Sequence, residues 1–295
     1  MKKIKYPRSL KSLFPKLFDK GMILATHRGY GKMGPIAENT IEAFRESTKV
    51  GFRAHELDVR LSKDGKLILF HGPNLQRTTS GFGKLEKQTF NELKKIDWGY
   101  YLKNSAATSL SKKTPPTNLP TAQKKRQKTT DSKNQIIEIT TLDDYLKEFG
   151  KKCITNIEVK KEWYIFNRNL ENRVIECVKQ HKLEQRVLYS SFNILSMRYL
   201  RKKQAESVIG VLKDKGPALL PFWAPLLLSI FVKIVKPDTI NLHPSLATTN
   251  LVKKYKDRGY GVLVWKINDT KIYDTMKKAG VDVAITDNIN LLEEV

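Results

Sequence analysis

Short apolar runs and amphipathic stretches alternate along most of the chain. The stretches between the runs repeat apolar positions every three or four residues, as in NTIEAFRESTKVGF and RVIECVKQHKL. Because strands that alternate with helices form parallel sheets, the pattern predicts an α/β fold. The apolar runs, which are rich in β-branched residues, cover 22–28, 54–61, 66–71, 153–160, 186–192, 207–212, 238–244, 261–268 and 281–288.

One connection departs from this alternation. The runs 54–61 and 66–71 are joined only by the residues SKDG, which suits an antiparallel hairpin and is too short for a parallel crossover. Setting this hairpin arm aside leaves eight strands, the number that a TIM (β/α)8 barrel requires. A doubly wound open sheet is the alternative, but no GxGxxG or P-loop motif follows the first strand. We therefore expect the barrel.

We expect a single barrel domain over 21–295, preceded by a basic segment over 1–20. An insertion at about 72–138 separates the hairpin arm from the next strand. Its part 103–135 is rich in Ser, Thr, Pro, Lys and Gln and has almost no aliphatic residues. Such a composition buries too little apolar surface to offset the entropy of ordering, which predicts a mobile basic surface loop.

The chain is strongly basic, with a formal net charge of +24. This charge favours partners that carry negative charge, such as nucleic acid, anionic membranes or phosphorylated substrates. The segments 1–20 and 103–135 contribute +6 and +7 of it. Because no zinc-finger, RNP or leucine-zipper pattern accompanies the charge, we expect no nucleic-acid partner.

Nothing in the sequence resembles a secretory leader or a membrane span. The longest uncharged stretch, 216–232, is interrupted by three prolines. We therefore expect a cytoplasmic protein with peripheral contact to the inner face of an anionic membrane. The two cysteines, Cys153 and Cys177, form no CxxC pattern, and we expect both to be reduced and buried.

Two of the apolar runs carry charged residues two positions apart. Glu56 and Asp58 are two residues apart and share one face of their strand, and so do Glu158 and Lys160. In a TIM barrel such strand ends form the active site. Buried carboxylates are costly unless something compensates them. A divalent cation held by all three carboxylates would do so, and ligation by oxygen alone favours Mg²⁺ or Ca²⁺ over zinc.

Two histidines are expected beside these carboxylates. With the hairpin turn centred near 63–64, residue 56 falls roughly opposite residue 71, which brings His71 to the site. His27 ends the first strand, which neighbours 54–61 in a barrel. Two histidines that flank a metal site suit phosphodiester cleavage: one accepts a proton from the attacking hydroxyl and the other protonates the leaving alkoxide.

The remaining strand-end residues are weaker candidates. His55 is predicted to face away from Glu56 into the helix layer, and His181 lies on a Lys-rich helix, so neither is assigned a role. His243 is either pocket lining or structural. Asp287 ends a strand, but Asp before Asn is also a common turn former, and we assign it no role.

The segments HRGYGKMGPIAENTIEAF (27–44) and ELDVRLSKDGKLILFH (56–71) resemble the opening motifs of the glycerophosphodiester phosphodiesterase family. The motifs LQRTTSGFG, TLDDYL, NIEVK, SSF, VLVWKIN and VAITDN follow in the family's order, so the resemblance covers about 22–290. It implies a TIM barrel that uses a divalent metal to hydrolyse glycerophosphodiesters to an alcohol and glycerol 3-phosphate, in many members through a cyclic phosphate.

By residue, the resemblance makes His27 and His71 the acid/base pair. It makes Glu56, Asp58 and Glu158 the metal ligands. It makes Arg28 and Lys160 phosphate contacts and has Glu38 and Asn39 help to build the pocket. Trp265 is either barrel core or a wall for the substrate's glycerol, and the family motif favours the wall.

Two positions depart from the family pattern. Gly72 stands where the family usually has an Asp, and Ala37 stands where it has a Pro. The missing Asp removes a hydrogen-bond partner that orients His71. We expect this to change the rate or the substrate without abolishing activity.

The stretch GPALLPFWAPLLLSIFVKIV (216–235) has two interpretations. It is either a helix buried against the barrel, or its first half lies exposed on the rim of the active site, where apolar residues would serve a lipid substrate. In the second case the chain acts on lysophospholipids at a membrane whose anionic lipids bind its basic side chains. We call the residues concerned the apolar lip: Leu219, Leu220, Phe222 and Trp223.

Two other functions remain open from the sequence. The barrel could be catalytically silent and bind polyanions or membranes. It could also cleave phosphodiesters by ring closure without hydrolysis.

Overall fold

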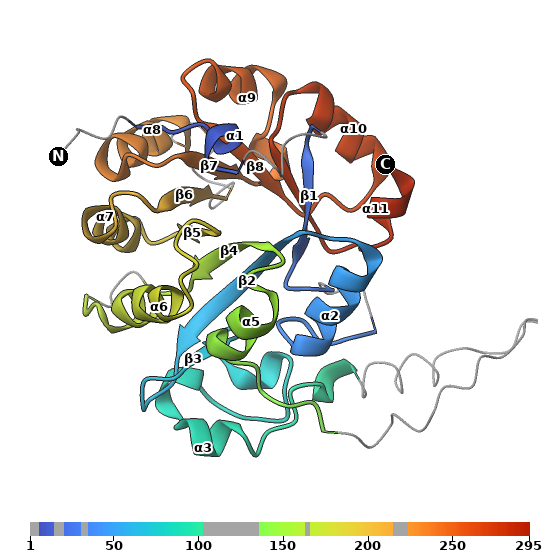
Figure 1. The fold of residues 1–295 in the computed structure, drawn as a ribbon, viewed down its shortest axis with the longest axis vertical. Coiled ribbons are helices and arrows are strands. Elements are labelled where there is room, and N and C mark those ends of the chain that lie inside the picture. Colours follow the sequence, from blue (N-terminus) through green and yellow to red (C-terminus); the bar gives the residue numbers. More distant parts are fainter. Residues whose placement is uncertain (1–5, 15–20, 31–34, 103–135, 163–165, 215–223) are drawn as a thin grey trace, which may run out of the picture.

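The computed structural model describes residues 6–14, 21–30, 35–102, 136–162, 166–214 and 224–295. Eight parallel strands form a closed barrel in the order β1-β9-β8-β7-β6-β5-β4-β2, and the pairing of β1 with β2 closes it. This confirms the predicted TIM barrel (Figure 1). The strands are β1 (Ile23–His27), β2 (Ala54–Leu61), β3 (Leu67–Leu69), β4 (Ile154–Val159), β5 (Val187–Ser191), β6 (Val208–Lys213), β7 (Thr239–Leu242), β8 (Gly261–Trp265) and β9 (Val283–Thr286).

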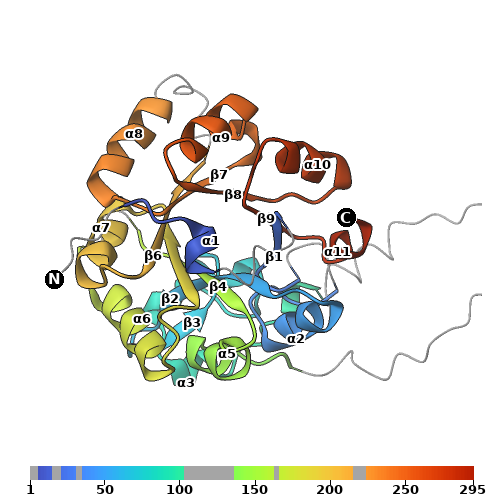
Figure 2. The same ribbon diagram turned by 45° about the horizontal axis from the view of Figure 1, so that its top comes forward.

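Most of the helices surround the barrel, as Figures 1 and 2 show. Many begin at a polar N-cap, and the side chains of Thr40, Thr141, Asn193, Thr248 and Asp269 each accept a backbone N–H there. The helices are α1 (Leu10–Leu13), α2 (Ile41–Val50), α3 (Phe90–Leu93), α5 (Leu142–Phe149), α6 (Asn169–Gln180), α7 (Ile194–Lys203), α8 (Ala224–Val235), α9 (Thr249–Lys256), α10 (Thr270–Lys278) and α11 (Leu291–Glu294).

The predicted hairpin is present, but its register differs from the expectation by one residue. β3 pairs antiparallel with β2, with Val59 opposite Leu69, and the amide of Phe70 donates to the carbonyl of Asp58. Residue 71 is therefore not opposite residue 56. The reason is a three-residue turn, closed by the bond from Ser62 N to Lys66 O, in which Gly65 has a φ of 84°.

The insertion packs as a small apolar unit against β3, in cyan near α3 in Figure 1. It contains α3 and two short 3-10 helices, η2 (Leu75–Arg77) and η3 (Leu85–Lys87). The segment 103–135 lies outside the described residues. The core of this unit is formed by Ile68, Phe70, Leu75, Leu85, Leu93, Ile96 and Trp98.

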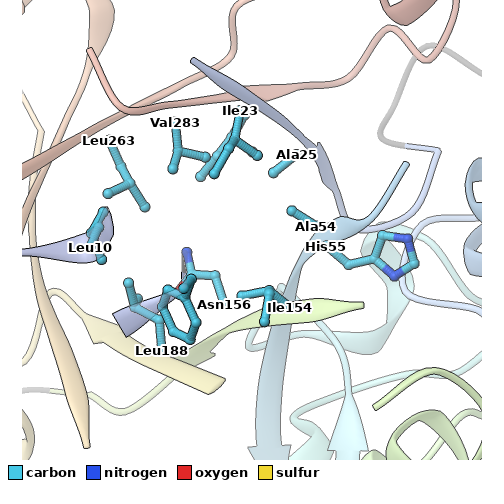
Figure 3. Close-up of a pocket in the computed structure, with 12 residues that line it drawn as sticks. Leu10, Ile23, Ala25, Ala54, His55, Ile154, Asn156, Leu188, Leu263 and Val283 are labelled. Carbon is cyan, nitrogen blue, oxygen red and sulfur yellow. The ribbon is translucent and has the colours of Figure 1, made fainter. Parts of the chain in front are cut away.

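The amino-terminal end of the barrel is closed by α1. Leu10 and Phe14 are buried in an apolar cluster with residues at the strand beginnings, including Ile23 and Val208. A Cβ added to Gly261 would lie 2.6 Å from Leu10 Cδ1, so this glycine makes room for the leucine. Figure 3 shows Leu10 among the residues that surround the remaining cavity of about 40 Å³.

Arg8 anchors this amino-terminal segment. Its Nη2 lies 2.9 Å from Oδ2 of Asp238, an oxygen that Arg201 Nη2 also contacts at 2.6 Å. Arg8 further donates to the carbonyls of Glu206 and Ser207. The carboxylate of Asp238 is fully buried, and the two guanidinium groups provide the compensation that a buried charge requires.

The second half of the apolar stretch 216–235 forms α8, on which Ile230 and Ile234 are exposed and Val235 is buried. The apolar lip, Leu219, Leu220, Phe222 and Trp223, lies outside the described residues. None of the described helices is long and apolar enough to cross a membrane.

The packing of α1 predicts a measurable contribution to stability. We expect Leu10→Ala to lower the free energy of unfolding by about 2–5 kcal/mol, because it enlarges the cavity at the end of the barrel. The control Leu195→Ala removes a side chain that is 44% exposed and should change stability by about 0.5 kcal/mol or less. Denaturant unfolding measures both, and equal effects would contradict a packed role for α1.

Candidate active site

The strand register brings the predicted site residues together at the carboxyl ends of β1, β2 and β4. His27 is the register partner of Glu56, and Asp58 is the register partner of Glu158. Glu56, Asp58 and Glu158 are buried, and each offers a carboxylate oxygen within 4.8 Å of the others. Three carboxylates at this separation can hold one cation.

A tight turn after β1 aims Arg28 at these carboxylates. Arg28 and Gly29 both have positive φ angles, of 59° and 82°. A Cβ on Gly29 would lie 2.7 Å from the Cβ of Ala43, so only glycine lets the turn pack against α2. The guanidinium of Arg28 then lies 2.8 Å from Asp58 Oδ2 and donates to Glu38 Oε2 at 2.9 Å.

Glu38 and Asn39 do not line the pocket of the active site but contact other residues of the site. The side-chain amide of Asn39 donates to Asp58 Oδ2 at 3.0 Å, and its oxygen accepts from the backbone N–H of Asp58. Glu38 binds the side chains of Arg28 and Arg77. Both residues therefore hold other site residues in position.

Lys160 is the second cation of the site. Its Nζ lies 2.5 Å from Glu158 Oε1 and 3.1 Å from Asp58 Oδ1.

Burial raises the pKa of a carboxyl group because it favours the protonated form. At Asp58 the charges of Arg28 and Lys160 outweigh the effect of burial, and the pKa of Asp58 is well below the usual range. At Glu56, burial and the neighbouring Asp58 and Glu158 raise the pKa well above it. Oε2 of Glu56 is buried and makes no hydrogen bond to any described residue.

His27 is held by Asp287, which the sequence analysis left without a role. His27 Nδ1 lies 2.5 Å from Asp287 Oδ1, and Nε2 lies 3.8 Å from Glu56 Oε2. Burial by itself raises the pKa of Asp287, but its hydrogen bond with His27 outweighs this, and the pKa is about 2. The ionised carboxylate keeps a proton on Nδ1, so Nε2 of the neutral ring is free to accept one. The side-chain amide of Asn268 donates to Asp287 Oδ2, and the side-chain oxygen of Asn268 accepts from the backbone N–H of Asp287.

His71 lies half-buried in the same pocket. Arg60 holds its backbone, since Nε and Nη2 each lie 3.3 Å from His71 O. Burial lowers the pKa of His71 to about 2, and Nδ1 has no hydrogen-bond partner among the described residues. Gly72 offers no carboxylate to this nitrogen, and a Cβ there would lie 3.2 Å from Arg77 Nε.

Most of the predicted site residues, although not Asp58, line one pocket of about 170 Å³. Trp265 lines it together with Phe192, which the sequence analysis did not single out and whose ring centroid lies 6.0 Å from that of Trp265. His243 packs edge-on against Trp265 and bonds Ser245. The predicted members of the lining are His27, Arg28, Glu56, His71, Glu158, Lys160 and Trp265.

His55 points away from this site, as predicted. Its Nδ1 lies 3.0 Å from Tyr145 Oη in the helix layer, and Figure 3 shows the ring directed out of the barrel. Burial lowers the pKa of His55 to about 3, so the ring is neutral.

A family model described as the glycerophosphoryl diester phosphodiesterase family matches residues 27–291. The chain belongs to this family. It is therefore an enzyme of the phosphoric diester hydrolase class that acts on glycerophosphodiesters.

A curated relative agrees with this membership, and solved structures share the fold. The glycerophosphodiester phosphodiesterase of Caldanaerobacter subterraneus subsp. tengcongensis is 30% identical over 282 residues, which cover 93% of this chain and 99% of the relative. An Oleispira antarctica phosphodiesterase, solved with the product sn-glycerol-3-phosphate, is 23% identical with a TM-score of 0.72 over 94% of this chain and 98% of that one. The Thermotoga maritima glycerophosphodiester phosphodiesterase is 24% identical with a TM-score of 0.66 over 92% and 97%.

The contact between Asp287 and His27 predicts a positioning role. We expect Asp287→Asn to lower kcat by about 10²–10⁴-fold with little change in KM, because the imidazole loses its orientation and the support for its charged form. The control Asp274→Asn alters an exposed residue of α10 and should have no effect. Steady-state kinetics test this, and a kcat within twofold of the unmodified enzyme would contradict the role.

Proposed function

We propose that this phosphodiesterase hydrolyses glycerophosphodiesters to an alcohol and glycerol 3-phosphate by a metal-dependent mechanism with two histidines. The observation that carries the proposal is the meeting of His27, His71 and the carboxylates of Glu56 and Glu158 in one pocket. The product found in the Oleispira antarctica relative supports glycerol 3-phosphate as the second product.

The donor set fits a hard divalent cation. Glu56, Asp58 and Glu158 would hold it through oxygen, the ligand that Mg²⁺ and Ca²⁺ prefer. The buried Oε2 of Glu56, which has no hydrogen bond to a described residue, supports this assignment because such an atom is costly without a partner. When bound, the cation polarises the phosphoryl oxygens and stabilises the charge that develops on them.

The protein's own side chains supply the proton transfers. His27 presents Nε2 to the pocket, where it can accept a proton while Asp287 stabilises the imidazolium. The negative charge of a bound phosphodiester raises the pKa of His71, so that its ring can carry the proton that it gives to the leaving alkoxide. The roles of the two histidines reverse if the departing group lies on the other side. Arg28 and Lys160 contact the phosphoryl oxygens and offset their charge. Trp265 forms an apolar wall for the glycerol carbons.

Metal removal and substitution separate these roles. We expect EDTA to abolish turnover and Mg²⁺ or Ca²⁺ to restore it. Glu56→Gln and Glu158→Gln should weaken metal binding, measured by calorimetry, as well as activity. His71→Ala should keep metal binding but lower kcat by about 10²–10⁴-fold. The control Glu206→Gln, at an exposed site, should change neither. Full activity in EDTA would refute the metal requirement.

The silent binding module is less well supported than the enzyme. A module that binds polyanions has no use for two histidines beside three buried carboxylates, which are costly to keep. Glu56→Ala would leave the affinity of such a module intact, whereas it abolishes turnover by the enzyme. Analysis of the products distinguishes hydrolysis from ring closure.

We also propose lysophospholipids as substrates at the inner face of a membrane. The proposal rests on the apolar lip, which follows β6 in the chain and precedes α8. β6 ends at the same edge of the barrel as the catalytic residues, since Leu212 lines the active-site pocket. Basic side chains near an anionic surface each add about 1 kcal/mol of attraction.

A paired assay tests the lipid proposal. We expect Trp223→Ala to lower turnover of lysophosphatidylcholine on vesicles while leaving turnover of glycerophosphocholine unchanged, because only the lipid substrate needs the lip. Phe82→Ala, which removes an aromatic side chain that is 79% exposed and lies outside the apolar lip, serves as the control. If glycerophosphocholine is strongly preferred and Trp223→Ala changes neither rate, the lipid proposal is wrong and the soluble activity stands.

A further inference from the structure

A second group of metal-ligand side chains lies in the helix layer, away from the carboxylates of the active site. Among the described residues, Asp143, Cys177 and His181 place a carboxylate oxygen, a sulfur and an imidazole nitrogen within 4.8 Å of one another. Cys177 and His181 are four residues apart at the end of α6 and share one face, and Asp143 lies in the first turn of α5. Figures 1 and 2 show α5 beside α6.

The chemistry of this donor set differs from that of the active site. The active site offers only carboxylate oxygens, which suit hard cations. A sulfur and an imidazole select softer ions, and three protein ligands of the types Cys, His and Asp with water as the fourth form a familiar environment for zinc.

The distances are compatible with such an ion after small side-chain shifts. His181 Nε2 and Asp143 Oδ1 are hydrogen-bonded at 2.8 Å. Tetrahedral zinc with ordinary bond lengths holds its ligand atoms about 3.3–3.8 Å apart. The separation of 2.8 Å is shorter than this, and the three ligand atoms all lie within 4.8 Å of one another, so small shifts of the side chains suffice to reach it. Asp143 and Cys177 also line a surface groove of about 460 Å³, through which an ion and water can enter.

The local charges favour a cation. The carboxyl end of α6 carries the negative end of the helix dipole, and His181 caps that end. Burial and the nearby Asp143 raise the pKa of the Cys177 thiol to about 12. A divalent ion would compensate the thiolate and the carboxylate together, and its binding would release the thiol proton.

We propose that Asp143, Cys177 and His181 form a binding site for zinc or a similar thiophilic divalent cation, separate from the active site, that links α5 to α6. The site is independent of the proposed catalytic mechanism.

Cobalt is the probe, because Co²⁺ replaces zinc and gives a near-ultraviolet charge-transfer band when a thiolate binds it. The full-length enzyme, with Mg²⁺ in excess to fill the active site, is titrated with Co²⁺. The chain has only two cysteines. Cys153, whose Sγ lies 3.8 Å from His55 Nε2 in the core, therefore supplies a matched control.

We expect a band that saturates at one equivalent, persists in Cys153→Ser and is absent in Cys177→Ser. His181→Gln, which removes a half-buried surface side chain and keeps the thiol, should weaken Co²⁺ binding by more than about tenfold. It should also abolish a zinc-dependent rise in Tm of several degrees. Phosphodiesterase activity with Mg²⁺ should stay within twofold in both Cys177→Ser and His181→Gln.

Three results would overturn the proposal. They are the absence of a sulfur-to-cobalt band in the unmodified enzyme, a band that depends on Cys153, and unchanged Co²⁺ affinity in His181→Gln. Because the band reports thiolate ligation and not turnover, these outcomes do not depend on whether the enzyme hydrolyses the expected substrates.

Discussion

The buried carboxylates of Glu56, Asp58 and Glu158 and the two cations beside them constrain the rest of the active site. Three negative charges in a barrel interior cannot persist without compensation. Arg28 and Lys160 lie within 3.1 Å of Asp58, and they hold its pKa low, while the pKa of Glu56 is raised by burial and by its acidic neighbours. With all three carboxylates ionised, Arg28 and Lys160 leave the cluster one positive charge short of balance, which a divalent cation and the single negative charge of a phosphodiester together would satisfy.

Much of the surrounding sequence serves to hold these charges in place. Gly29 permits the turn that aims Arg28, Asn39 binds Asp58 through both its amide atoms, and Arg60 holds the backbone of His71. Asp287 fixes the ring of His27 from the last strand. Reactive side chains that hydrogen bonds already fix in place lose little conformational entropy when substrate binds. Catalysis by a preorganised site requires this.

The two ends of the barrel differ in the side chains that fill them. At the carboxyl ends of the strands, polar and charged side chains line the pocket, and its carboxylates are costly to bury. At the opposite end, Leu10 and Phe14 fill the interior and Arg8 is bound to Asp238. The segment that looked from its composition like a basic extension thus contributes part of the core.

The sequence by itself determined the strands and helices, the closed barrel with its hairpin arm, and the carboxylate face of β2. These follow from local periodicity: residues two apart on a strand share a face wherever the strand lies. It did not determine the hairpin register, because Gly65 adds a third residue to the turn and shifts His71 by one position. Asp287 and His27 are 260 residues apart, so no local pattern predicts their contact. Cys177 and His181 lie at the end of a helix for which the sequence pattern predicts only that it is amphipathic. Which distant side chains meet depends on barrel closure and helix packing, and only the tertiary structure decides that.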